Sequence, residues 1–95
     1  MPKINIMQIK AEILIKTLGE IIKAHRLKTG KSIHQISAEA SIPKPTWSRI
    51  ENGKYKDIQF VNLWKISEGL EIDIKDLVGE LSLKMGKDFS ITENE

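Results

Sequence analysis

The sequence predicts an all-α protein built from five helices, and three observations carry this prediction. Apolar residues recur at intervals of three and four along residues 18–81, as on one face of a helix, without sustained alternation of apolar and polar residues. Gly30, Pro45 and Gly53 stand where helices would end or begin. A length of 95 residues suits one compact domain, here residues 17–81, with short N- and C-terminal extensions, residues 1–16 and 82–95.

The first helix of the domain is expected to begin at Thr17, which has the spacing of a capping box with Glu20, and to end at Gly30. Its buried stripe would consist of Leu18, Ile21, Ile22 and Leu27. Two alternatives stay open for the N-terminal extension. Residues 3–6 alternate like a strand, whereas Ile6, Ile9 and Ile13 are spaced for a helix that runs straight into the first one.

The second and third helices are short and are separated by a break at residues 41–43. Ser32 is a good N-cap for a helix from Ile33 to about Ala40. The third helix would run from Lys44 to Asn52 and stop at Gly53, with Pro45 in its first turn, where a proline loses no hydrogen bond. The small residues between these helices, which would permit a close crossing, are Ser37, Ala40 and Ser41.

Two further helices are expected in the second half of the chain. The fourth would end near Gly69 and bury one face, made of Phe60, Leu63, Trp64, Ser67 and Leu70. Asp73 can cap a fifth helix from Ile74 to about Glu80. Both Trp47 and Trp64 are expected in the core. Beyond Lys84 we expect a frayed end rather than an edge strand at residues 89–92.

Charge is distributed unevenly along the chain. The net charge is only +2, but residues 23–56 carry eight cations against two anions, whereas residues 57–95 carry four lysines against nine acids. A basic middle is the asymmetry expected when one face meets phosphates, although scatter over a solvated surface is the alternative.

Composition excludes several classes of site. The chain has no cysteine, so a disulfide, a thiolate nucleophile and a cysteine zinc site are excluded, and a reducing cytoplasmic setting fits. His25 and His34 lie on different expected helices, so we expect neither a metal site nor a cofactor. No partnered base, nucleophile or phosphate loop is seen, which argues against an enzyme. No segment is apolar enough for a signal peptide or a membrane span.

Two short helices joined by a tight turn, with a basic second helix, form a helix-turn-helix. Across residues 18–81 the sequence resembles the lambda-repressor-like domains of the Xre and Cro type. The resemblance rests on Leu18 to Arg26 followed by Gly30, on Ile36-Ser37 with Ala40-Ser41-Ile42, on Leu63, Ile66, Leu70, Ile72 and Leu77, and above all on Trp47-Ser48-Arg49-Ile50-Glu51-Asn52-Gly53.

The resemblance implies roles for individual residues. Base edges of double-stranded DNA would be read by Lys44, Pro45, Thr46 and Arg49, of which Arg49 suits a bidentate contact with guanine. Phosphates would be held by Ser32, Ile33, His34, Ser48, Lys54, Tyr55 and Lys56. Arg26 and Glu51 match a structural ion pair beneath the recognition helix. Pro45 and Ile33 depart from the family pattern, because neither side chain can donate a hydrogen bond.

The favoured function is therefore a transcriptional repressor that binds a palindrome as a homodimer, through Leu77, Val78 and Leu81. Two alternatives are kept. The chain could be an antitoxin that also uses residues 1–16 or 82–95 to bind a toxin. It could instead be a protein-interaction adaptor that has kept the fold and lost DNA reading, as the departures at Ile33 and Pro45 would allow.

Overall fold

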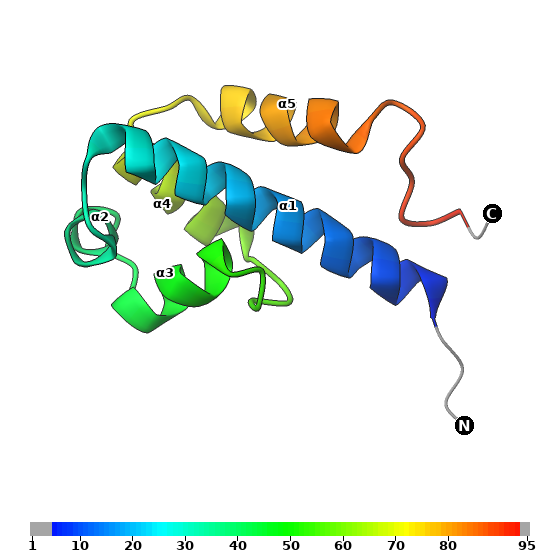
Figure 1. The fold of residues 1–95 in the computed structure, drawn as a ribbon, viewed down its shortest axis with the longest axis horizontal. Helices are drawn as coiled ribbons and strands as arrows, with labels where there is room; N and C mark the ends of the chain where they lie inside the picture. Colours follow the sequence, from blue (N-terminus) through cyan, green and yellow to red (C-terminus); the bar gives the residue numbers. More distant parts are fainter. Residues whose placement is uncertain (1–4, 94–95) are drawn as a thin grey trace.

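The structure is a computed structural model that describes residues 5–93. These residues form the five expected helices (Figure 1): α1 Ile6–Thr29, α2 Ile33–Glu39, α3 Lys44–Glu51, α4 Phe60–Leu70 and α5 Ile74–Met85. The prediction of an all-α fold is confirmed. No strand occurs within the described residues, so residues 89–92 do not form one, and residues 3 and 4 of the alternative strand lie outside the described range.

Helix α1 is 24 residues long and begins well before Thr17, where the sequence predicted its start. It begins after Asn5, whose side-chain Oδ1 accepts hydrogen bonds from the backbone amides of Met7 at 3.0 Å and Gln8 at 3.4 Å. The expected capping box at Thr17 is wrong, because the Thr17 hydroxyl donates to the Ile13 carbonyl in mid-helix at 2.8 Å. The predicted end is correct, since Gly30 caps the helix with φ +74°.

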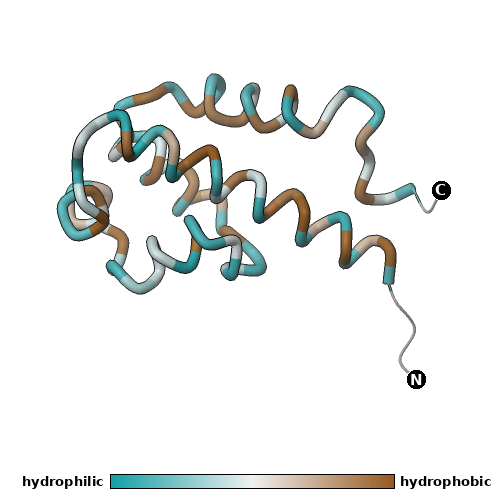
Figure 2. The backbone as a smooth tube through the Cα atoms, in the orientation of Figure 1, coloured by the Kyte–Doolittle hydropathy of each residue, from teal (hydrophilic) through white to brown (hydrophobic). Residues whose placement is uncertain are grey.

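The other helices pack around α1. Helix α1 contacts α3, α4 and α5, while α2 packs against α3 and α4 (Figure 1). The fully buried side chains come from all five helices: Ile21, Ile22, Ile36, Trp47, Ile50, Ile66 and Leu77. Figure 2 shows that hydrophobic residues recur to the N-terminal end of α1, beyond the part that this core covers.

Three predicted core residues lie at the surface. Leu27 is 60% exposed, because the inward position one turn after Ile22 is occupied by Arg26. Phe60 is 66% and Trp64 47% exposed. The inward face of α4 instead carries Leu63, Ile66, Ser67 and Leu70, and this face is shifted around the helix from Phe60 and Trp64.

The C-terminal part of the chain is more ordered than the sequence predicts. Asp73 caps α5 as expected, with Oδ1 accepting from the Lys75 amide at 2.7 Å, but the helix continues to Met85 rather than ending near Glu80. Residues 86–93 return towards the start of α1, where the Lys10 ammonium donates to the Glu93 carbonyl. This segment helps to form an apolar groove against α1 and α5, lined by Leu14, Val78, Leu81, Met85 and Phe89. None of the helices described is both long and apolar enough to span a bilayer.

Candidate nucleic-acid interface

Helices α2 and α3 are joined by a tight turn at residues 40–43. The Ile42 amide donates to the Ser37 carbonyl at 2.9 Å, and Ser41 adopts a left-handed conformation with φ +56°. Ser37 and Ala40 are buried, whereas Ser41 is exposed in the turn. Ala40 lies against Gly69 of α4, where an added Cβ would be 2.8 Å from the Ala40 Cβ. Helix α2 packs against α3 across this turn, which is the helix-turn-helix arrangement.

Helix α3 has clear start and stop signals. Pro43 precedes it and Pro45 lies in its first turn, as predicted. At the other end Asn52 donates through Nδ2 to the Ser48 carbonyl at 2.8 Å, and Gly53 turns the chain with φ +69°. The Lys54 amide then donates to the Arg49 carbonyl at 2.8 Å, so the first residue of the following basic loop is fixed to the helix end.

One face of α3 is buried and the other is open to solvent. Trp47, Ile50 and Glu51 point into the protein. Of the four predicted base-reading residues, Lys44, Pro45 and Arg49 are exposed and Thr46 is half-buried. The structure thus places Lys44, Pro45 and Arg49 on the outer face of one short helix, where a major groove can accept them, with Thr46 at the edge of that face.

A buried ion pair supports α3 from beneath. Arg26 donates through Nε to Glu51 Oε2 at 2.5 Å and through Nη2 to Oε1 at 3.0 Å, and both residues are buried. Nη1 reaches the Lys31 carbonyl at 3.0 Å. The hydrogen bond to Glu51 raises the pKa of Arg26 against the opposing effect of burial. A bidentate pair of this kind fixes both the distance and the orientation of α3 relative to α1.

The structural roles of two residues at this site were not predicted from the sequence. Trp47 donates from Nε1 to Glu51 Oε2 at 2.6 Å, so the carboxylate is held from two sides. Gly19 lets α1 approach α3, because a Cβ there would lie 2.3 Å from the Ile50 carbonyl oxygen. The signal for Trp47 was its position four residues before Glu51, one helical turn away. Nothing in the local sequence marks Gly19, which occurs mid-helix.

The predicted phosphate-contacting residues differ in their exposure to solvent. Lys54 and Lys56 are exposed in the loop after α3, and His34 is exposed on α2. Ser32 forms a capping box with Gln35, its Oγ accepting from the Gln35 amide at 3.1 Å. Ile33 and Tyr55 are half-buried and pack against the core, and Ser48 is half-buried beside Asn52.

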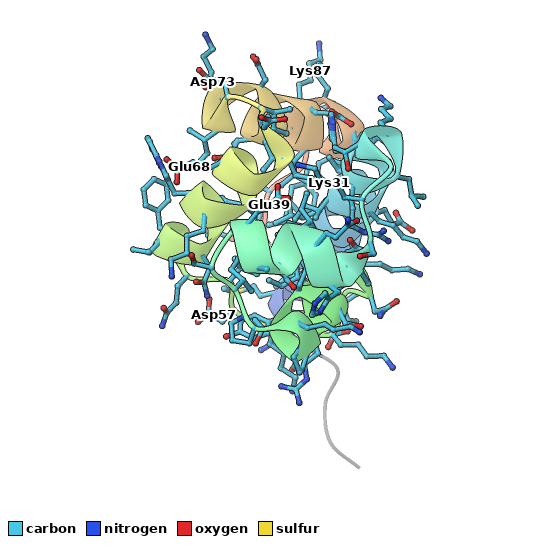
Figure 3. The ribbon with its side chains drawn as sticks, turned by 90° about the vertical axis from the view of Figure 1, so that its left-hand side faces the viewer. Lys31, Glu39, Asp57, Glu68, Asp73 and Lys87 are labelled. Atoms are coloured by element: carbon cyan, nitrogen blue, oxygen red, sulfur yellow. The ribbon has the colours of Figure 1, made fainter. Side chains whose placement is uncertain are left out.

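Two cations of the basic middle segment are already paired, Arg26 with Glu51 and Lys31 with Glu39. Lys31 donates to Glu39 Oε1 at 2.6 Å, and Figure 3 shows the two residues close together. The hydrogen bond to Glu39 raises the pKa of Lys31. The unevenness of charge in the sequence therefore overstates the number of cations free to meet phosphates.

The predicted dimer contact is contradicted at Leu77, which is completely buried in the core and offers no surface to a second copy. Val78 is 42% exposed and Leu81 is half-buried, and both line the groove next to residues 86–89 of the same chain. A dimer contact through Val78 and Leu81 stays a prediction. The sequence placed these three residues on α5 correctly, but periodicity alone could not tell which of them face inward.

Comparison with known proteins places the chain in a family. Residues 22–77 match the family described as Helix-turn-helix. The HTH-type transcriptional regulator SlrR of Bacillus subtilis is 33% identical over 60 residues, which make up 63% of this chain and only 40% of SlrR. Control protein C.MunI of Mycoplasma sp is 33% identical over 70 residues, covering 74% of this chain and 93% of C.MunI.

Two solved structures share the fold at low sequence identity. The restriction-modification controller protein C.AhdI from Aeromonas hydrophila is 19% identical, with a TM-score of 0.63 over 66% of this chain and 94% of that one. The clp gene regulator ClgR from C. glutamicum is also 19% identical, with a TM-score of 0.69 over 79% of this chain and 96% of that one. The chain therefore belongs to the helix-turn-helix family of transcriptional regulators, with the lambda-repressor-like fold of the Xre and Cro type.

Proposed function

We propose that the chain is a transcriptional repressor that binds double-stranded DNA sequence-specifically as a homodimer in the cytoplasm, without catalysis. The observation that carries this proposal is the outer face of α3. It presents Lys44 and Arg49 to solvent, while the opposite face is held rigid by the buried pair of Arg26 and Glu51. A rigid, exposed and cationic helix has the properties needed to enter a major groove.

In this proposal Arg49 carries most of the sequence discrimination. Its guanidinium can donate two parallel hydrogen bonds to the O6 and N7 atoms of guanine. Lys44 lies about one turn earlier and can reach a neighbouring guanine or a phosphate. Thr46 is able to contact a thymine methyl group. Pro45 has no side-chain donor, so its contribution is limited to apolar contact and to the geometry of the helix start.

Phosphate contacts would position the helix in the groove without reading sequence. The exposed ammonium groups of Lys54 and Lys56 follow α3 directly and are the main candidates. Ser32, His34, Ser48 and Tyr55 would add single hydrogen bonds at the edges. Ile33 contributes only its backbone, since its side chain packs against the core.

Separate substitutions test this division of roles. On a duplex selected from a random pool, Arg49→Ala is expected to cost about 1 to 3 kcal/mol of binding free energy and to relax preference at one base pair. Replacing Lys54 and Lys56 by alanine should weaken all duplexes alike and lower the slope of log affinity against log salt by about 0.9 per lysine. Fluorescence anisotropy over a salt series measures both effects. Identical behaviour of the two variants would contradict the assignment.

A second candidate function is favoured by one observation, an exposed apolar stripe on the N-terminal half of α1. Ile6, Ile9 and Ile13 are 45%, 41% and 49% exposed and fall on one helical face. Such a stripe fits an antitoxin that binds a small toxin enzyme as well as DNA. The double change Ile9→Lys and Ile13→Lys would then abolish co-purification of that enzyme and leave affinity for the selected duplex unchanged. If wild-type chain purified from its source carries no such enzyme, this candidate fails.

A further inference from the structure

We propose that a second copy of the chain docks on an apolar patch at the start of α4, formed by Phe60, Val61 and Trp64 and called here the α4 patch. The choice of a second copy as occupant rests on the proposed function, because a palindrome needs two recognition helices related by a two-fold axis. This surface differs from the one predicted from the sequence, which lies on α5.

The α4 patch is a contiguous apolar feature of the surface. Phe60, Val61 and Trp64 are 66%, 62% and 47% exposed, and the two aromatic rings pack edge to face with their centroids 6.0 Å apart. Together they expose on the order of 300 Å² of side chain, since an aromatic side chain alone offers about 150 to 250 Å². Aromatic residues grouped in this way form the centre of protein interfaces, where a polar rim completes the contact.

The fold of one copy does not account for these side chains. Leu63, Ile66 and Leu70 already fill the inward face of α4, and Phe60 and Trp64 lie outside the buried core. Exposing three large apolar side chains on adjacent turns is unfavourable in water and promotes association. A partner that covers them would remove this cost.

The charges around the α4 patch suit a second copy. Lys56 and Asp57 precede the helix, and Lys65 and Glu68 lie on it beyond the patch, so the rim carries two cations and two anions. Asp57 and Glu68 lie along the same side of the molecule (Figure 3). In a two-fold antiparallel contact of α4 with α4, Glu68 of one copy lies opposite the residues that precede Phe60 in the other, including Lys56. A mixed rim can thus pair with itself.

The apolar stripe on α1, made of Ile6, Ile9 and Ile13, is the competing surface for a second copy. Its rim is also mixed in charge, because Glu12 and Glu20 lie one turn before and one turn after Lys16. Position rather than charge therefore distinguishes the two surfaces.

The position of the α4 patch also fits two-fold binding to a duplex. Only residues 52–59 separate the end of α3 from the start of α4, whereas α5 lies across α1 from α3 (Figure 1). The recognition helices of a dimer must enter successive major grooves about 34 Å apart on one side of the DNA. A contact close to the end of α3 keeps them within that reach, and a contact on the outer face of α5 would move them apart.

Cross-linking tests the contact directly, because the native chain contains no cysteine. Val61→Cys provides a single thiol on the α4 patch, and Leu83→Cys and Ile9→Cys provide matched thiols on α5 and on the α1 stripe. With a short bis-maleimide and no DNA, Val61→Cys should give covalent dimer at least about ten times faster than either control at equal protein concentration. If Val61→Cys cross-links no faster than Leu83→Cys, or if Ile9→Cys is the fastest, the proposal is overturned.

Sedimentation equilibrium of Val61→Glu supplies the second measurement. The residue is exposed in one copy, so circular dichroism should show unchanged helix content, while the dimer dissociation constant should rise at least about 100-fold. An unchanged dissociation constant, or a monomeric wild type at about 100 µM, would overturn the docking surface. A wild type that dimerises through the α4 patch but binds no duplex would instead refute the proposed function, so the two failures are distinguishable.

Discussion

At the scale of single residues, the site depends on the carboxylate of Glu51. It accepts hydrogen bonds from Arg26 on α1 and from Trp47 on its own helix, and all three side chains are buried. The resemblance to the family supplied the ion pair. The spacing of Trp47 and Glu51 by one helical turn permits the bond from Trp47 but does not establish it, because a core tryptophan at that spacing is equally compatible with a purely apolar contact.

The guanidinium of Arg26 keeps its positive charge over the ordinary range of pH. The pKa of Arg26 in the folded protein lies above its usual value, because the guanidinium is hydrogen-bonded to Glu51. A group with a raised folded pKa contributes its full stability below the unfolded pKa and loses it as pH rises through the folded value. For Arg26 this window is strongly alkaline, so the pair should hold α3 in place at neutral pH.

We predict that Glu51→Ala destabilises the protein by about 3 to 5 kcal/mol, because it leaves the guanidinium of Arg26 buried without its counter-charge. Urea unfolding followed by circular dichroism at neutral pH measures the change. The control is Glu39→Ala, which removes the partner of the surface residue Lys31 and should leave the unfolding midpoint unchanged. Equal effects of the two substitutions would contradict a special role for the buried pair.

Single residues also show where hydrophobic periodicity is ambiguous. Leu27 and Arg26 are neighbours, and the periodic pattern alone favours the leucine for the core, yet the arginine is buried because Glu51 compensates its charge. Trp64 and Phe60 fit the apolar face of α4 but lie at its edge. Only the packing of α4 in the structure shows that Phe60 and Trp64 are exposed.

At the scale of elements, caps and breakers predicted the middle of the chain well. Ser32, Pro45, Gly53 and Asp73 each lie at the helix end that the sequence assigned to them. The ends of the chain were harder, because the N-terminal half of α1 and the last turns of α5 depend on each other and on residues 86–93. Such contacts between distant segments leave no local signal.

The close approach of α1 and α3 gives a prediction with an internal control. Gly19→Ala should destabilise the protein by about 1 to 3 kcal/mol, since the new Cβ would collide with the backbone carbonyl of Ile50 and push α3 away. Gly79→Ala lies on α5 with no atom near its Cβ and should stabilise the protein by about 0.5 to 1 kcal/mol through helix propensity. Thermal unfolding of both variants measures the difference. Destabilisation of equal size at both positions would show that the crossing is not tight.

At the scale of the whole molecule, a small core supports one helix with an exposed outer face, α3. Two apolar surfaces, on α1 and α4, are exposed to solvent. The core and helix α3 were predicted from residue pattern and family resemblance. The uncovered surfaces, on α1 and α4, were not, because their residues have the same spacing as core residues and differ only in what covers them. Partner binding is therefore where the structure adds most to the sequence.

The most direct test of the central claim, that the outer face of α3 reads base sequence, is the affinity of the full chain for two duplexes. One is the site selected from a random pool, and the other is the same duplex with its sequence shuffled. At physiological salt we predict binding to the selected site at least about 1,000-fold tighter, with a two-fold symmetric consensus in the selected pool. Equal affinity for the two duplexes at every salt concentration would contradict the claim.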